Sequence, residues 1–97
     1  MLPKSLRLTG DEVLTVLKNG KSLRAPTASV KYIPAPRGKV AVVVSLKVAK
    51  LAAKRNALRR AGYRALPRTL PPRHMVFFIQ QQPFAPQDIA ALCSQLS

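Results

Sequence analysis

The stretch KVAVVVSLKVAKLAAKRNALRR, residues 39–60, contains the two elements on which the fold depends. Its first seven residues are almost continuously apolar, which is typical of a strand buried on both faces of a sheet. Helix-forming residues follow from about Val48 to Ala65, and Pro67 forbids any continuation of the helix. A buried strand that leads into a helix predicts a layered domain in which helix packs on sheet.

The predicted helix separates apolar from basic side chains. At about 100° per residue, one stripe is apolar and should face the sheet. Its members are Val48, Leu51, Leu58 and Leu66. The opposite side is basic and carries Lys50, Lys54, Arg60 and Arg64. A solvated helical face normally mixes both signs of charge, whereas this one has no acid, so we expect a polyanionic partner.

Arg55 is an exception, because its position lies along the apolar stripe, with Arg59 at the edge of that stripe. An unpaired charge there is costly. Two explanations remain open: the stripe is narrow and Arg55 emerges beside the sheet edge, or Arg55 binds a phosphate, which its planar guanidinium grips with two hydrogen bonds. Asn56 both donates and accepts hydrogen bonds, as recognition of RNA hydroxyls and bases requires, although a helical asparagine is often only exposed.

The residues before this stretch predict a capped helix and a first strand. Thr9-Gly10-Asp11-Glu12 has the pattern of a capping box, and Gly20 is a natural stop for the short amphipathic helix that follows. ASVKYI, residues 28–33, alternates in polarity and predicts a strand, while PAPRG, residues 34–38, predicts a turn.

The residues after the stretch predict a connector, a strand and a helix. LPRTLPPR, residues 66–73, is a proline-rich connector, and HMVFFIQQQ, residues 74–82, predicts the third strand. Pro86 begins a closing helix, whose apolar positions are Ile89, Leu92, Cys93 and Leu96. The order helix, strand, strand, helix, strand, helix predicts an α+β two-layer sandwich of a small mixed sheet with about three helices.

Composition indicates a single basic domain over residues 1–97, because two separate cores would each be too small. Seventeen Lys and Arg residues against three acids give a formal net charge of +14, so nucleic acid is the leading partner and an anionic membrane surface the weaker one.

No apolar run approaches the roughly 18–20 residues of a membrane span. Because MLPKSLRLTGDE lacks the apolar core of a signal peptide, we expect a cytoplasmic protein. Cys93 stands alone, which leaves no partner for an internal disulfide or a cysteine zinc cluster.

Two segments carry a family resemblance. VSLKVAKLAAKRNALRRAGYR, residues 44–64, and RLTGDEVLTVLKNGKSLR, residues 7–24, together resemble the protein component of bacterial ribonuclease P, and the resemblance covers roughly residues 5–82. Its most specific element is KRN at this spacing after VSLK. The resemblance implies the family's order α-β-β-β-α-β-α, ribosomal-protein-like, with an unusual left-handed βαβ crossover.

The resemblance also implies a set of binding residues. Arg55 and Asn56 match the first two motif positions, and the family's second motif arginine is Ala57 here. The aromatic residues that the family places on its first helix are Val13 and Leu17. The candidates for binding the catalytic RNA and the substrate are Ser45, Lys47, Lys50, Lys54, Arg55, Asn56, Arg59 and Arg60. Tyr32 is the nearest surviving aromatic platform for stacking of the substrate's leader, and at least one of Phe77 and Phe78 should lie in the core.

The resemblance implies that the active site belongs to a catalytic RNA and that this chain has no catalytic residue of its own. The reaction is hydrolysis of the phosphodiester bond between the 5′ leader and mature tRNA, assisted by Mg²⁺ bound mainly by the RNA, with no organic cofactor. The partners are the catalytic RNA and precursor tRNA, and no obligate protein partner is predicted. The residue types agree with a site in the RNA, because a metal-dependent protein nuclease needs carboxylates to hold its ions. Asp11, Glu12 and Asp88 suit helix starts instead, and His74 by itself cannot form a nuclease site. We therefore expect no metal site in the chain.

Two alternative functions are compatible with the same positive net charge and the same layered fold. A structural ribosomal-type RNA-binding protein would need no leader cleft and would have no role in catalysis. A DNA-binding helix is weaker, because no helix-turn-helix arrangement precedes residue 48.

Overall fold

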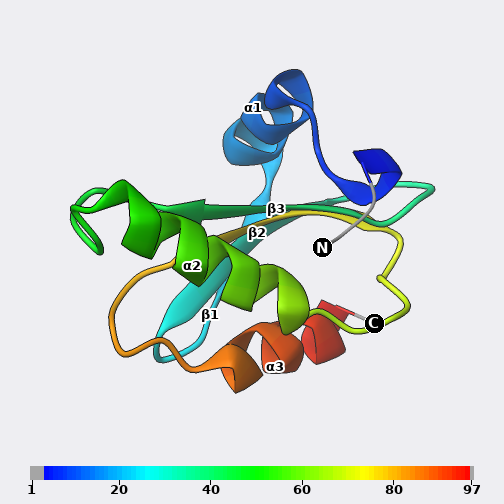
Figure 1. Ribbon diagram of the computed structural model, residues 1–97. Helices are drawn as coiled ribbons and strands as arrows, with labels where there is room; N and C mark the ends of the chain where they lie inside the picture. Colours follow the sequence, from blue (N-terminus) through cyan, green and yellow to red (C-terminus); the bar gives the residue numbers. More distant parts are fainter. Residues whose placement is uncertain (1–3, 97) are drawn as a thin grey trace.

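A four-stranded mixed sheet organises the chain, with helices on both of its faces (Figure 1). The computed structural model describes residues 4–96. The elements are η1 (Lys4–Leu6), α1 (Gly10–Asn19), β1 (Lys21–Arg24), β2 (Ala28–Pro34), β3 (Lys39–Val44), α2 (Ala52–Arg64), β4 (Arg73–Ile79) and α3 (Pro86–Leu96). The strand order is β1-β2-β4-β3; β3 and β4 are parallel, whereas the other neighbours are antiparallel. The predicted α+β class, with its mixed sheet and three α-helices, is confirmed.

The element order is the one that the family resemblance implies, with a strand that residue patterns had not predicted. β1 pairs with β2 and places Lys21 opposite Tyr32. Three of its four residues are exposed and only Leu23 is partly buried, so the segment KSLR has no apolar alternation to reveal it. Its strand character comes from pairing with β2, which tertiary structure supplies.

β3 is an edge strand and is not buried on both faces, so that prediction is wrong. Val40 and Val42 are buried, while the residues between and beside them are partly exposed. The free edge is partly covered: the N–H of Leu8 donates to the carbonyl of Val40 at 3.0 Å, and the N–H of Val42 donates to the Tyr63 hydroxyl at 3.4 Å. Pairing of this kind blunts an exposed edge.

α2 begins at Ala52 rather than at Val48, because residues 45–51 form turns that end in the extended N-cap Leu51. Leu51 is 63% exposed, so it does not belong to the stripe that faces the sheet, whereas Leu58 packs against the core. Gly62 is buried against Val42, where a Cβ would lie 2.9 Å from a valine methyl. Glycine is thus the close-packing point between α2 and β3.

The hydrophobic core lies between one face of the sheet and the pair α2 and α3 (Figure 1). Met75, Phe77 and Ile79 alternate along β4 and point into it. The predicted apolar positions of the closing helix are all buried there: Ile89, Leu92, Cys93 and Leu96. Burial raises the pKa of the Cys93 thiol to about 11, which fits a packing role and disfavours a reactive thiolate.

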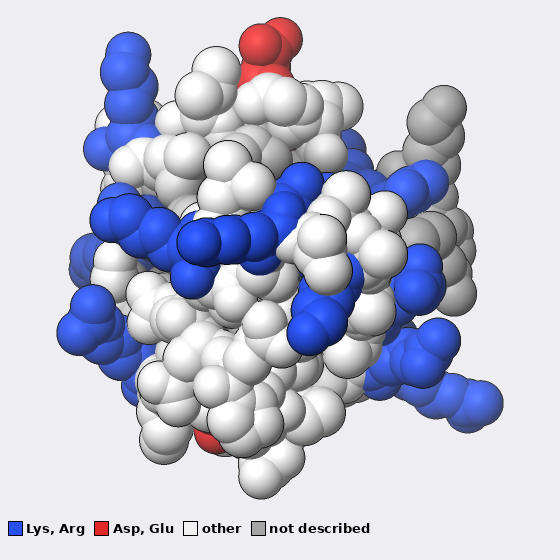
Figure 2. Space-filling view, turned by 60° about the vertical axis from the view of Figure 1, so that its left-hand side comes forward, with Lys and Arg blue, Asp and Glu red and all other residues white. Residues whose placement is uncertain are grey.

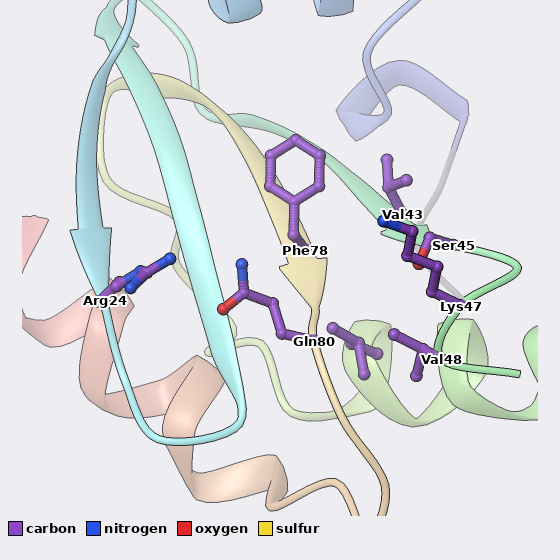
Figure 3. Close-up of a pocket in the computed structure, with 8 residues that line it drawn as sticks. Arg24, Val43, Ser45, Lys47, Val48, Phe78 and Gln80 are labelled. Carbon is purple, nitrogen blue, oxygen red and sulfur yellow. The ribbon is translucent and has the colours of Figure 1, made fainter.

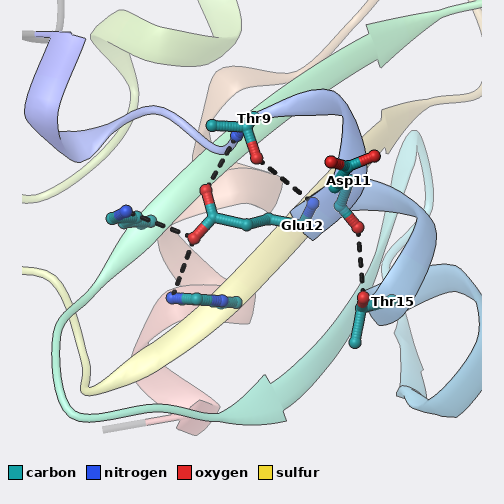
Figure 4. Close-up of polar contacts among 6 residues, drawn as sticks. Thr9, Asp11, Glu12 and Thr15 are labelled. Carbon is teal, nitrogen blue, oxygen red and sulfur yellow. Dashed lines mark hydrogen bonds and ion pairs between the residues drawn. The ribbon is translucent and has the colours of Figure 1, made fainter.

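α1 lies over part of the opposite face, where Val16 and Val76 are buried. The predicted capping box is present (Figure 4): the N–H of Glu12 donates to Thr9 Oγ1 at 3.3 Å, and the N–H of Thr9 donates to Glu12 Oε1 at 2.9 Å. Lys39 Nζ lies 3.2 Å from Glu12 Oε2. The Thr9 hydrogen bond, with help from Lys39, lowers the pKa of Glu12. The cap thereby joins α1 to β3.

Candidate nucleic-acid interface

An open groove lies on the sheet face that α1 covers only in part. The strand register places Phe78 between Ser29 of β2 and Val43 of β3 on this face. A cavity of about 380 Å³ is lined by Arg24, Val43, Ser45, Lys47, Val48, Phe78, Ile79 and Gln80 (Figure 3). A neighbouring cavity of about 280 Å³ shares three of these residues and adds Ser22, Ser29 and Lys31. We call the two together the sheet groove.

The sheet groove combines an aromatic ring with positive charge. Figure 3 shows Arg24 on one side of Phe78 and Gln80, and Lys47 on the other. Phe78 is partly exposed, whereas its neighbour Phe77 is fully buried, so one of the two phenylalanines is core, as predicted. No acidic side chain lines either cavity. A ring for base stacking, flanked by cations for phosphates, is the arrangement of a single-strand-binding surface.

The loop of residues 45–51 carries Ser45 and Lys47 to the sheet groove, and it also carries Lys50, which is exposed and lines neither cavity. The side chains of Arg55 and Gln82 hold the loop by hydrogen bonds to its backbone carbonyls. Arg55 Nη1 donates to the carbonyls of Ala49 at 3.1 Å and Lys50 at 2.8 Å, and Gln82 Nε2 donates to the carbonyl of Val48 at 2.8 Å. Neither explanation offered for Arg55 includes these partners, which are the backbone carbonyls of two residues that precede the N-cap Leu51 of α2.

The remaining candidates lie along α2. Lys54, Asn56, Arg59 and Arg60 are exposed, and Asn56 Oδ1 accepts a hydrogen bond from the Arg59 guanidinium. Figure 2, which looks toward the side where α2 begins, shows Lys and Arg side chains in a band across the middle of this face and acidic ones only at its margins. The predicted residues thus divide between the sheet groove and the outer side of α2.

Tyr32 lies away from the sheet groove. It shares its face of β2 with Ala28 and Val30, packs against the core, and has the Arg73 guanidinium 5.3 Å from its ring centre. Phe78 is therefore the aromatic residue in the sheet groove. Sequence reasoning missed Arg24, Lys31 and Gln80 altogether, because their common face depends on strand pairing between distant segments.

The chain's acidic side chains line neither cavity of the sheet groove. Thr27 donates from both its N–H and its hydroxyl to Asp88 Oδ2, at 2.8 and 2.5 Å. Glu12 holds the capping box, and Asp11 is exposed in the first turn of α1. Within residues 4–96 no three His, Cys, Asp or Glu side chains gather as a metal-binding group. Over the same residues, no helix has the length and hydropathy to cross a membrane.

The fold and the two basic surfaces define a small α+β protein suited to binding nucleic acid. Comparison with known families then identifies which one: the model of the family Ribonuclease P matches residues 2–97. The chain belongs to the ribonuclease P protein family.

Two curated relatives are similar in sequence. The ribonuclease P protein component of Thermus brockianus is 40% identical over 74 residues, which cover 75% of this chain and 45% of the relative. That of Thermus aquaticus is 40% identical over 55 residues, or 57% of this chain and 34% of the relative. The chain thus matches less than half of the length of these relatives.

Solved structures agree on the fold. The RNase P protein from Thermotoga maritima superposes with a TM-score of 0.73 at 19% identity, covering 94% of this chain and 97% of that one. The RNase P protein of Staphylococcus aureus gives a TM-score of 0.73 at 16% identity, covering 96% and 93%.

Proposed function

We propose that this chain is the RNA-binding protein subunit of ribonuclease P and assists a catalytic RNA in removing the 5′ leader from precursor tRNA. The observation that carries the proposal is the sheet groove, in which Phe78 lies between Arg24 and Lys47 with no acid nearby, on a chain of this family. The groove binds the single-stranded leader. The protein acts in the cytoplasm.

The basic side of α2 and the loop before it bind the catalytic RNA. Their cations displace counterions from RNA phosphates, so the complex tightens as salt is lowered. Arg55 contributes by fixing the loop through the carbonyls of Ala49 and Lys50, which positions Lys47 and Lys50. The two RNA-binding surfaces meet at this loop, so the protein holds substrate and ribozyme together.

The Mg²⁺ that assists hydrolysis belongs to the RNA in this proposal. Carboxylates are the ligands by which proteins hold this ion, and the three in this chain do not converge. Asp11 and Glu12 lie at the start of α1, whereas Asp88 lies in α3 on the other side of the sheet, bonded to Thr27. The chain contributes binding and orientation, and no step of the reaction runs through its side chains.

Phe78→Ala will weaken binding of a single-stranded leader oligonucleotide by about 1–3 kcal/mol, the scale for one stacked base. Fluorescence anisotropy with a labelled oligonucleotide measures the loss. Phe78→Leu is the matched control for packing, because it keeps an apolar side chain and removes only the ring. Equal affinities for wild type, Phe78→Leu and Phe78→Ala would mean that no base stacks in the sheet groove.

The proposed function is tested by identifying the RNA that accompanies the protein when it is isolated under native conditions. We expect a tRNA-maturation ribozyme, because α2 and the loop of residues 45–51 together carry seven Lys and Arg side chains. A variant with Lys47, Lys50 and Arg59 changed to alanine should recover less of that RNA. Enrichment of ribosomal RNA instead would support the structural ribosomal-type alternative and overturn the proposal.

A further inference from the structure

The loop of residues 45–51 exposes two leucines to solvent. Within residues 4–96 the exposed large apolar side chains are Leu14, Leu46 and Leu51, and the last two belong to this loop. Leu46 is 65% exposed and Leu51 is 63% exposed. Figure 1 shows that the loop projects beyond the end of β3 and leads into α2. We call Leu46 and Leu51 together the leucine tip.

The structure of the loop keeps the leucine tip outside the core. The two apolar residues between the leucines turn inward: Val48 packs against the core, and Ala49 is only 4% exposed. The N–H groups of Val48 and Ala49 donate to the carbonyl of Ser45, at 3.1 and 3.2 Å. Together with the bonds from Arg55 and Gln82, these hydrogen bonds fix the loop. Burial of the leucine tip therefore requires a partner from outside the chain.

Cations accompany the leucine tip. Lys47 and Lys50 of the loop are exposed, as is Lys54 in the first turn of α2. No acidic residue occurs between Glu12 and Asp88 in the sequence. Figure 2, which faces this end of the molecule, shows Lys and Arg side chains beside uncharged ones. A second copy of this chain would bring like charges together, so the partner must be anionic and must also cover apolar surface.

An unpaired RNA base meets both requirements. Its flat face is apolar and the phosphates on either side of it are anionic, and proteins recognise RNA chiefly at such unstacked bases. Apolar side chains, leucine among them, pack against bases in other nucleic-acid complexes. The leucine tip also lies between the two surfaces assigned to RNA: Ser45 and Lys47 of the same loop line the sheet groove, and Lys54 begins the basic side of α2.

We infer that the leucine tip packs against the face of an unpaired base of the catalytic RNA, while the neighbouring lysines contact the phosphates beside that base. The apolar contact adds a part of the affinity that does not depend on salt, which the cations cannot supply. The inference rests on the proposed function. A base of the precursor's leader has the same chemistry, so the test has an arm for each RNA.

The first arm measures affinity for a bacterial ribonuclease P RNA as a function of salt. The double variant Leu46→Ala, Leu51→Ala should bind about tenfold more weakly, because it loses the apolar contact. Its slope of log affinity against log salt should equal that of the wild type, because no phosphate contact is removed. Lys50→Ala, in contrast, should make the slope shallower by about one. Leu14→Ala is the matched control at a leucine of α1 that is 62% exposed, and it should leave the affinity unchanged.

A second double variant tests whether apolar surface is what matters. Leu46→Met, Leu51→Met keeps a long apolar side chain at both positions and should retain most of the affinity. Unfolding midpoints are measured in parallel and should change little, because both positions are exposed. Wild-type RNA affinity in the alanine double variant would overturn the inference. A shallower salt slope in that variant would also overturn it, since the loop would then have moved and lost phosphate contacts.

The second arm compares the wild type and the alanine double variant on two other probes, a labelled single-stranded leader oligonucleotide and vesicles that contain phosphatidylglycerol. We expect the two proteins to bind each probe equally. A loss confined to the leader would assign the leucine tip to the substrate, and a loss confined to the vesicles would assign it to an anionic membrane; either result would overturn the inference. If the wild type bound no ribonuclease P RNA, the proposed function would fail as well, whereas equal RNA binding by both proteins would overturn the inference alone.

Discussion

Leu92→Ala will lower the free energy of unfolding by about 2–5 kcal/mol, the range for truncating a fully buried leucine. Leu92 has no exposed surface and belongs to the core cluster that also contains Met75 and Phe77 of β4. The substitution removes buried methyl groups and leaves a cavity that close packing does not refill. In a small domain this is a large part of the total stability, so the unfolding midpoint in denaturant should fall strongly.

The matched control is Leu14→Ala, the same substitution at a side chain that is 62% exposed on α1. It should change stability by no more than about 0.5 kcal/mol, the usual range for surface positions. Both variants are measured at one salt concentration, because the net charge of +14 makes stability depend on screening. An unchanged midpoint for Leu92→Ala would show that α3 does not cover the core.

Elements with local signals could be predicted from the sequence. The Thr9 capping box and the Gly20 stop set both ends of α1, and the periodicity after Pro86 placed α3 with its buried face. These signals succeed because caps and helical periodicity act between residues close in the chain. Family membership was predictable for the same reason, since KRN after VSLK is a local pattern.

Features that depend on distant partners were not predictable in this way. The apolar run before Ser45 is compatible with a central strand or an edge strand, and only the sheet order shows that β3 is at the edge. Arg55 looked like an unpaired charge because its partners are backbone carbonyls of a loop that was expected to be helix. Phe78 became the groove aromatic only once the register set it between β2 and β3.

The central claim is that this chain binds and positions RNA while the catalytic RNA performs the chemistry. It rests on an acid-free groove around Phe78, a basic α2 and carboxylates that serve helix starts and ion pairs. Family membership agrees with it. A cleavage assay tests this claim directly, because it distinguishes cleavage by the protein alone from cleavage that requires the catalytic RNA.

The measurement is cleavage of precursor tRNA at low Mg²⁺ by the protein alone, by a matching catalytic RNA alone, and by both together. We expect no cleavage by the protein alone, slow cleavage by the RNA alone and a large increase when the two are combined, because the protein's cations replace the screening that Mg²⁺ otherwise supplies. An unrelated basic protein at equal charge controls for general screening. Robust Mg²⁺-dependent cleavage by protein freed of RNA would contradict the account.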